Sequence, residues 1–512
     1  MAEAIVNTKR IAKNTLMLYF RQILIMLVSL YTVRVVLNVL GAEDYGIYNV
    51  VAGVVTMFSF LSGAMATASQ RYFSFDLGKG DIESLKKTFS VTFTIYVILA
   101  LLVVLLAETL GLWFVYNKLV IPAERFTAAK WIYQAAVISF LFTLITTPYM
   151  SAIIAHENMN VYAYVSIVEA ALKLGIVFLL KILPFDKLIL YGFLLLTVAV
   201  INTSTYRFYC RKKYEECRLR LLWDKKLFKE IFSFTGWTLF GQFTSVVRNQ
   251  AVTVLFNQFF TPVVVAARSI SMQITNAVNV FSSNFNTSLY PPIIKEYSAG
   301  NKNEMFNLLY TGCKMTFFLM WVFALPLIMH MDVVLSLWLK EVPEWTVLFT
   351  QLALIEVLIN SLSQPIATAA RAPGKMMAYE LILGTMQLFI FIVSWILFRL
   401  GYDAWVSFLI AIFINLVMMV VRLILVKGLV GLPLGLFTVK TILPILGMTI
   451  VSYGIVIGMR FIIPAGTFWS LVQIMLSVPI TCVVMFFVGM NKEQRIQILR
   501  VLKNKITLGK IS

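Results

Sequence analysis

The chain has 512 residues, of which 60% are hydrophobic and only 13% are charged. Soluble globular proteins carry about 25% charged residues, so this composition excludes an ordinary soluble protein. The formal net charge is +19, which would also suit a nucleic-acid-binding protein. Where the charges lie along the chain therefore decides what they mean.

Fourteen hydrophobic stretches are long enough to cross a membrane, since a spanning helix needs about 20 apolar residues. In chain order they are 14–38, 46–68, 89–115, 131–153, 160–181, 187–206, 231–259, 264–290, 306–331, 345–369, 377–398, 403–426, 437–460 and 467–489. The sequence therefore predicts an all-α, polytopic membrane protein with about 14 transmembrane helices.

The positive charges follow the topology of such a protein. With the N-terminus inside, 29 of the 43 Lys and Arg residues lie on or beside cytoplasmic segments, and nine of these lie in the segment Arg207–Lys229. Cytoplasmic loops carry an excess of Lys and Arg by the positive-inside rule. We therefore predict that both termini are cytoplasmic, and we expect no nucleic-acid partner.

The two halves of the chain look like copies of each other. A shift of 220 positions places Phe20, Gln22 and Gly80 on Phe240, Gln242 and Gly300. A shift of 217 positions places Pro148, Ala152, Met159 and Tyr162 on Pro365, Ala369, Met376 and Tyr379. Six helices, an even number, separate the copies, so the halves should have the same membrane orientation and enclose a substrate between two lobes.

This repeat predicts four parts. Residues 1–206 form an N-terminal lobe of six helices, 207–230 a basic cytoplasmic linker, and 231–427 a C-terminal lobe of six helices. Residues 428–512 add two further helices and a basic cytoplasmic tail.

Three motifs resemble a known family. They are VLNVLGAEDYGIY after the first helix, RYFSFDLGKGD after the second, and AARAPGKMMAYE between the tenth and eleventh. Together they resemble the polysaccharide-exporter branch of the multidrug/oligosaccharidyl-lipid/polysaccharide exporters, which includes bacterial O-antigen and capsule flippases. The resemblance implies two six-helix lobes in the bacterial inner membrane. It also implies that undecaprenyl-pyrophosphate-linked oligosaccharide moves from the cytoplasmic to the outer leaflet through a cationic cavity.

Four arginines within predicted spans are candidates for that cavity: Arg21, Arg34, Arg248 and Arg268. A charge at a helix centre costs about 3 kcal/mol on insertion scales, so it normally faces a cavity or a partner. The guanidinium fork suits phosphate oxygens. Structural pairing with a carboxylate or with helix carbonyls is the alternative for Arg21 and Arg248, and snorkelling to the interface is the alternative for Arg34.

Glu356, Glu169 and Lys173 are the candidates for coupling to a proton or sodium ion. Glu169 and Lys173 are spaced i, i+4 with the acid first, which also predicts a structural ion pair. Glu356 has the alternative role of partner to one of the arginines.

Other chemistries lack a sequence signal. No GxxxxGK[ST] motif is present. The two histidines, His156 and His330, are predicted on opposite sides of the membrane, and the four cysteines form no CxxC pair. We expect no catalytic residues, no metal site and no cofactor beyond an ion gradient.

A flippase for lipid-linked oligosaccharide is thus the leading interpretation, with membrane lipids, a polysaccharide polymerase and glycosyltransferases as expected partners. A cation-coupled multidrug or small-molecule exporter is the alternative on the same fold, and it predicts a cavity dominated by acids. A lipid II flippase also stays open. A membrane polymerase or ligase would predict a large outer loop or clustered catalytic residues.

Overall fold

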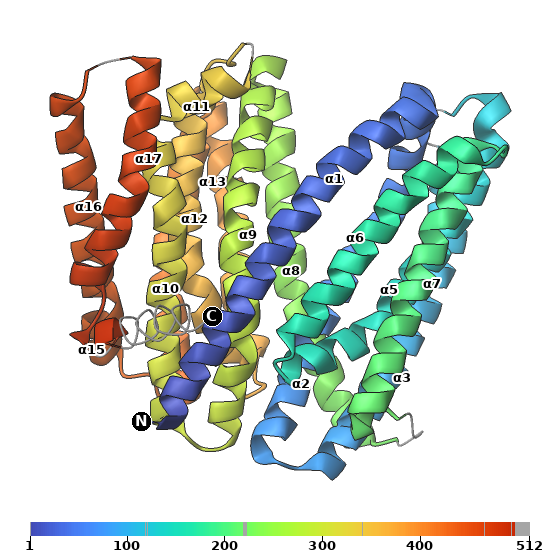
Figure 1. The fold of residues 1–512 in the computed structure, drawn as a ribbon, viewed down its shortest axis with the longest axis horizontal. Helices are drawn as coiled ribbons and strands as arrows, with labels where there is room; N and C mark the ends of the chain where they lie inside the picture. The colour runs from blue at the N-terminus through green and yellow to red at the C-terminus, as the bar shows by residue number, and fades with distance from the viewer. Residues whose placement is uncertain are drawn as a thin grey trace, which may run out of the picture. The chain divides into compact units, whose positions relative to one another are not determined.

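The computed structural model describes residues 2–117, 119, 121–218, 223–339, 341–464, 466–492 and 494–496. Within these ranges the chain is almost entirely helical and contains no strand. Figure 1 shows these helices in the colours of chain order. The all-α fold predicted from the hydrophobic stretches is confirmed.

The helices of the first half are α1 (Ala2–Thr56), α2 (Ser59–Lys79), α3 (Ile82–Leu106), α4 (Leu112–Asn117), α5 (Phe126–Ala155), α6 (Met159–Ile182) and α7 (Lys187–Lys213). A π-helical turn joins α3 to α4, so the two follow one another closely. Within α1, Gly41 has a φ of 81° and a ψ of 168°, which breaks the helix into two segments. Glycine adopts this conformation without the steric cost of a β-carbon.

The helices of the second half are α8 (Lys225–Phe259), α9 (Pro262–Ser298), α10 (Lys302–Met329), α11 (Met331–Trp338), α12 (Thr346–Arg371), α13 (Met377–Arg399), α14 (Val406–Val430), α15 (Leu434–Phe437), α16 (Leu443–Ile462) and α17 (Thr467–Val484). Gly300 follows α9 with a φ of 82°, and Gly80 follows α2 with a φ of 71°. The repeat aligns these two glycines, so both copies end a helix in the same left-handed way.

Each of the fourteen predicted spans lies on a helix or a closely joined pair of helices. Among the described residues, ten helices are long and apolar enough to cross a membrane, or eleven if Glu43–Thr56 and Ser59–Lys79 form one bent span. Three further helices, α6, α8 and α9, also have spanning length, and each carries charged side chains within its predicted span. Charged side chains inside a membrane helix normally face other protein or a hydrated cavity.

The chain divides into two compact units. Unit 1 contains residues 1–9, 243–293 and 301–512, and unit 2 contains residues 10–242 and 294–300. Three helices pass from one unit to the other: α1 after Lys9, α8 after Gln242 and α9 after Ile293. The lobe boundaries predicted from the sequence stay a prediction.

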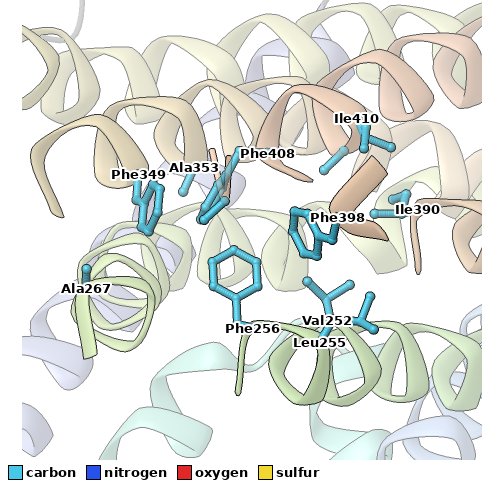
Figure 2. Close-up of a cluster of buried hydrophobic side chains, with 12 residues drawn as sticks. Val252, Leu255, Phe256, Ala267, Phe349, Ala353, Ile390, Phe398, Phe408 and Ile410 are labelled. Atoms are coloured by element: carbon cyan, nitrogen blue, oxygen red, sulfur yellow. The ribbon is translucent and has the colours of Figure 1, made fainter. Parts of the chain in front are cut away.

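The core of unit 1 is an aromatic cluster centred on Phe256 of α8, shown in Figure 2. Phe256 is fully buried, and its ring contacts those of Phe349, Phe398 and Phe408 edge-on at centroid distances of 6.0, 5.7 and 6.2 Å. Edge-to-face pairs of this kind add to the stabilisation from buried area. The cluster therefore holds α8 against α12, α13 and α14.

The last two long helices, α16 and α17, belong to unit 1 and pack against α10, and polar contacts of α10 reach α16 and the segment after α17. The Trp321 indole Nε1 donates to Ser452 Oγ at 2.9 Å, and the Lys314 ammonium donates to Gln494 Oε1 at 3.0 Å. Lys314 is only 1% exposed. Close packing and interhelical hydrogen bonds are what hold membrane helices together, because lipid provides no hydrophobic drive between them.

The core of unit 2 lies between α2, α3, α5 and α7. Phe73, Phe89 and Tyr149 are buried there, and the centre of the Phe89 ring lies 5.7 Å from that of Phe73 and 5.5 Å from that of Tyr149. Helix α5 packs against α3, α6 and α7, as Figure 1 also shows.

Candidate functional site

Unit 1 contains a group of charged side chains on α8, α9 and α12, which we name the arginine cluster: Arg248, Arg268 and Glu356. The Arg248 Nη1 donates to Glu356 Oε1 at 2.9 Å, and their side chains are only 16% and 15% exposed. Asn415 of α14 donates to the same Glu356 oxygen at 3.1 Å. One carboxylate therefore links α8, α12 and α14.

Arg268 completes the cluster from α9 and is 9% exposed. Its Nη1 donates to Thr253 Oγ1 at 2.6 Å, and its guanidinium carbon lies 4.9 Å above the centre of the Phe256 ring. Arg268 is also close enough to interact electrostatically with Arg248 and Glu356. The aromatic core of unit 1 thus forms the floor on which this arginine rests.

The arginine cluster carries two positive charges and one negative charge. Within the described part of the chain, Arg268 has no carboxylate within ion-pair distance. A buried charge without a counter-charge is costly, and an anion bound beside it would remove that cost. The cluster therefore favours an anionic ligand.

Helix α9 places several uncharged polar side chains next along the chain from Arg268. Six of these are buried, namely Ser271, Thr275, Ser282, Asn284, Asn286 and Ser288. Membrane helices carry buried hydroxyl and amide groups where they meet other helices or line a hydrated path.

Unit 2 contains a second buried arginine site, on α1. Arg21 is 8% exposed, and its guanidinium carbon lies 4.5 Å from the centre of the Tyr162 ring on α6. Its Nη2 lies 3.5 Å from Gln22 Oε1, at the limit of a hydrogen bond. Tyr206 of α7 is close enough to interact electrostatically with Arg21 and with Glu169. This arginine is thus held against aromatic side chains.

Glu169 and Lys173 form the ion pair that their spacing predicts. The Lys173 Nζ donates to Glu169 Oε1 at 2.6 Å, and Asn202 of α7 donates to Glu169 Oε2 at 3.0 Å. The pair is partly exposed, at 29% for the Glu169 side chain and 47% for Lys173. The structural interpretation accounts for both residues, and an ion-coupling role stays a prediction.

Arg34 lies further along α1 and is exposed. The structure therefore separates the seven candidates into three sets. Arg248, Arg268 and Glu356 meet in unit 1; Arg21 and the Glu169–Lys173 pair lie in unit 2; and Arg34 stands apart. The pairing of Glu356 with an arginine is the alternative that the sequence left open for it.

Several partners of these residues were missed from sequence. Asn415 lies within the apolar run 403–426, and a polar residue at that place was a usable signal. Thr253 and Tyr162 gave none, because a threonine or tyrosine in a hydrophobic helix is ordinary. Only the packing of α8 on α9, and of α1 on α6, brings them to the arginines.

A family model described as "Polysaccharide biosynthesis protein" matches residues 11–297, more than half of the chain. No curated protein matches the sequence.

Solved structures of transporters share the fold. A MATE protein in its straight conformation aligns with a TM-score of 0.71 at 12% identity, covering 83% of this chain and 96% of that one. The outward-facing conformation of a multidrug resistance MATE family transporter of the MOP superfamily aligns with a TM-score of 0.70 at 11% identity, covering 83% and 96%. The Vibrio cholerae MATE transporter VcmN in its bent form aligns with a TM-score of 0.64 at 16% identity, covering 85% and 100%. At these identities the likeness concerns the fold.

Proposed function

Because this multi-pass membrane protein belongs to the polysaccharide biosynthesis protein family and has the MATE transporter fold, we propose that it is a lipid-linked oligosaccharide flippase. Its substrate would be an undecaprenyl-pyrophosphate-linked oligosaccharide. The protein would move it from the cytoplasmic to the outer leaflet of a bacterial inner membrane, for O-antigen or capsule synthesis. The observation that carries this proposal is the excess of positive charge in the arginine cluster.

The chemistry of the substrate suits that cluster. A pyrophosphate presents several anionic oxygens, and Arg268 and Arg248 present planar guanidinium groups that bind such oxygens with two parallel hydrogen bonds. In the described structure Arg248 is bonded to Glu356, so an anion would compete with that carboxylate for it. The uncharged amides and hydroxyls of α9 are suitable donors and acceptors for sugar.

Arg21 provides a second anchor in the other unit. Its burial against Tyr162 resembles the way Arg268 rests on Phe256, so each unit holds one of the candidate arginines on an aromatic ring. Alternating access between the two units would carry the head group across while the polyprenyl tail stays in lipid. A proton or sodium gradient would drive the cycle, with Glu356 as the first candidate for the coupling residue.

The test compares export in Arg21→Ala, Arg248→Ala and Arg268→Ala variants expressed at equal membrane levels in the native host. Arg34→Ala is the matched control, because that arginine is exposed. We expect loss of surface glycan and accumulation of undecaprenyl-linked oligosaccharide on the cytoplasmic side in the first three variants only. Normal export by all three variants would refute the assignment of these arginines to substrate binding.

One observation favours a second candidate function, a cation-coupled small-molecule exporter. Glu356 is a largely buried carboxylate with a neighbouring amide, which is a plausible place for a proton or sodium ion. That function predicts that deletion of the protein changes drug tolerance and leaves surface glycan intact. A lipid II carrier would instead accumulate lipid II in the depleted strain.

A further inference from the structure

The turn between α5 and α6 contains a glutamate in a backbone conformation that glutamate rarely adopts. Glu157 has a φ of 61°, and in the described part of the chain only one other non-glycine residue, Trp345, has a positive φ. Such a residue persists only where its surroundings hold it, so the reason for its presence lies in its contacts.

The internal repeat shows what this position requires. The shift of 217 that aligns Tyr162 with Tyr379 places Glu157 on Gly374, whose φ is 81°. Glycine satisfies the turn in the second copy without strain. The first copy has the same turn with a side chain added, so the backbone alone does not explain the glutamate.

The Glu157 carboxylate binds two cations from two different helices. Arg10 Nε of α1 lies 2.7 Å from Oε2, and Lys295 Nζ of α9 donates to Oε1 at 2.7 Å. The Glu157 side chain is only 1% exposed and that of Lys295 is 23% exposed, so water screens this pair little, whereas Arg10 is 46% exposed and its pair is screened more. Asn14 of α1 adds a hydrogen bond to the Glu157 backbone oxygen at 3.1 Å.

Arg10 and Lys295 lie where α1 and α9 pass from one unit to the other. Arg10 is the first residue of α1 in unit 2, and Lys295 is the second residue of α9 in unit 2. The Glu157 carboxylate therefore holds parts of α1 and α9 against the α5–α6 turn. Both helices continue from there into the other unit.

Packing at Gly78 shows how closely the end of α9 is held. A β-carbon built on Gly78 of α2 would lie only 2.6 Å from the Lys295 backbone oxygen, and it would also overlap Ser298 Oγ. Only glycine allows α2 and α9 to approach this closely. The end of α9 is thus fixed within unit 2 by one charge contact and one steric fit.

We propose that Glu157, Arg10 and Lys295 form an electrostatic latch, and that release of the latch frees the ends of α1 and α9 during the transport cycle. The role of the latch in transport rests on the proposed function. The contact itself, and its effect on how tightly α9 is held, can be tested without that function. A carboxylate that merely stabilised the turn would not need to bind two helices at their unit boundaries.

The test measures how fast a cysteine at position 298 reacts with a maleimide in detergent-solubilised protein. The Ser298→Cys substitution is made with Cys482→Ser, because Cys210, Cys217 and Cys313 are buried and Cys482 is exposed. Glu157→Gln removes the charge, and Lys302→Met, at an exposed lysine beyond the end of α9, is the matched control. Labelling needs no substrate, so its outcome is independent of the glycan.

A charge-assisted hydrogen bond is strong enough that its loss should raise the labelling rate about tenfold in Glu157→Gln. Lys295→Met should give a similar increase, the double variant should add little, and Lys302→Met should change nothing. Gly78→Ala leaves every charge in place and should raise labelling as well. Unchanged labelling in Glu157→Gln, or fully additive effects of the two charge variants, would overturn the latch.

Export by the same variants then connects the latch to transport. Raised labelling with impaired export and normal membrane levels would support release as a step of the cycle. Raised labelling with normal export would overturn the role in transport while leaving the flippase proposal untouched, since that proposal depends on the arginine variants.

Discussion

Removal of Glu356 is the sharpest test of the arginine cluster, because this single carboxylate offsets two guanidinium groups. Glu356→Ala would leave Arg248 and Arg268 close together without the carboxylate that binds Arg248. Breaking a buried ion pair in this way typically costs about 3–5 kcal/mol. The two side chains are 16% and 15% exposed, so screening is small and we expect a loss of about 3 kcal/mol of unfolding free energy.

Removing Arg248, the partner of Glu356, should lower the unfolding free energy less. Arg248→Met leaves Glu356 bonded to Asn415 and near Arg268, so one positive and one negative charge remain. We expect a loss of about 1–2 kcal/mol, the cost of one charge-assisted hydrogen bond. Glu356→Ala should therefore lose more unfolding free energy than Arg248→Met, because it leaves two positive charges without a negative one.

Equilibrium denaturant unfolding in detergent micelles, followed by tryptophan fluorescence, gives the two free energies. Glu169→Ala is the control, since it breaks a partly exposed pair that should contribute at most about 0.5–1 kcal/mol. Equal losses from Glu356→Ala and Arg248→Met, or a Glu356→Ala loss no larger than the control, would refute the argument from uncompensated charge.

Three further predictions concern other parts of the chain. Phe256→Ala should lower the unfolding free energy by about 3–5 kcal/mol in the same titration, because it empties the centre of the aromatic core. Gln494→Leu should cost about 1–3 kcal/mol, because it removes the acceptor of the buried Lys314 ammonium, whereas Lys314→Met removes the buried charge itself and should cost less. Burial lowers the pKa of Lys295, outweighing the opposite effect of Glu157 and adding to that of Arg10. The lysine should therefore lose its charge below the usual pH, and cysteine labelling at position 298 should rise with pH relative to a Lys295→Arg variant; parallel pH curves would contradict this.

Both units hold a buried arginine against an aromatic ring, and unit 1 adds an arginine that is paired with a carboxylate. In unit 1, Arg248 is paired with the Glu356 carboxylate while Arg268 lies over the Phe256 ring, whereas in unit 2 Arg21 lies against the Tyr162 ring. The aligned repeat does not place these arginines at matching positions, so the copies have diverged at their polar residues. An asymmetric substrate with a charged end and a neutral end is compatible with such divergence.

The sequence by itself determined the all-α membrane fold class and where the helices lie, and it predicts the repeat. These follow from the length of each apolar run and from where Lys and Arg lie, which are properties of local composition. It also determined the Glu169–Lys173 pair, because residues four apart on a helix are neighbours. The left-handed turns at Gly80 and Gly300 likewise follow from residue type.

Only the tertiary structure decided which charges meet. Arg248 and Glu356 are 108 positions apart, and Lys295 and Glu157 are 138 apart. Their pairing depends on which face of one helix packs against another, and membrane helices of similar apolarity leave that choice almost undetermined in sequence. The Glu157 turn was hidden for the same reason: its strain is visible in a backbone angle, and its two cations come from helices that begin and end far from it along the chain.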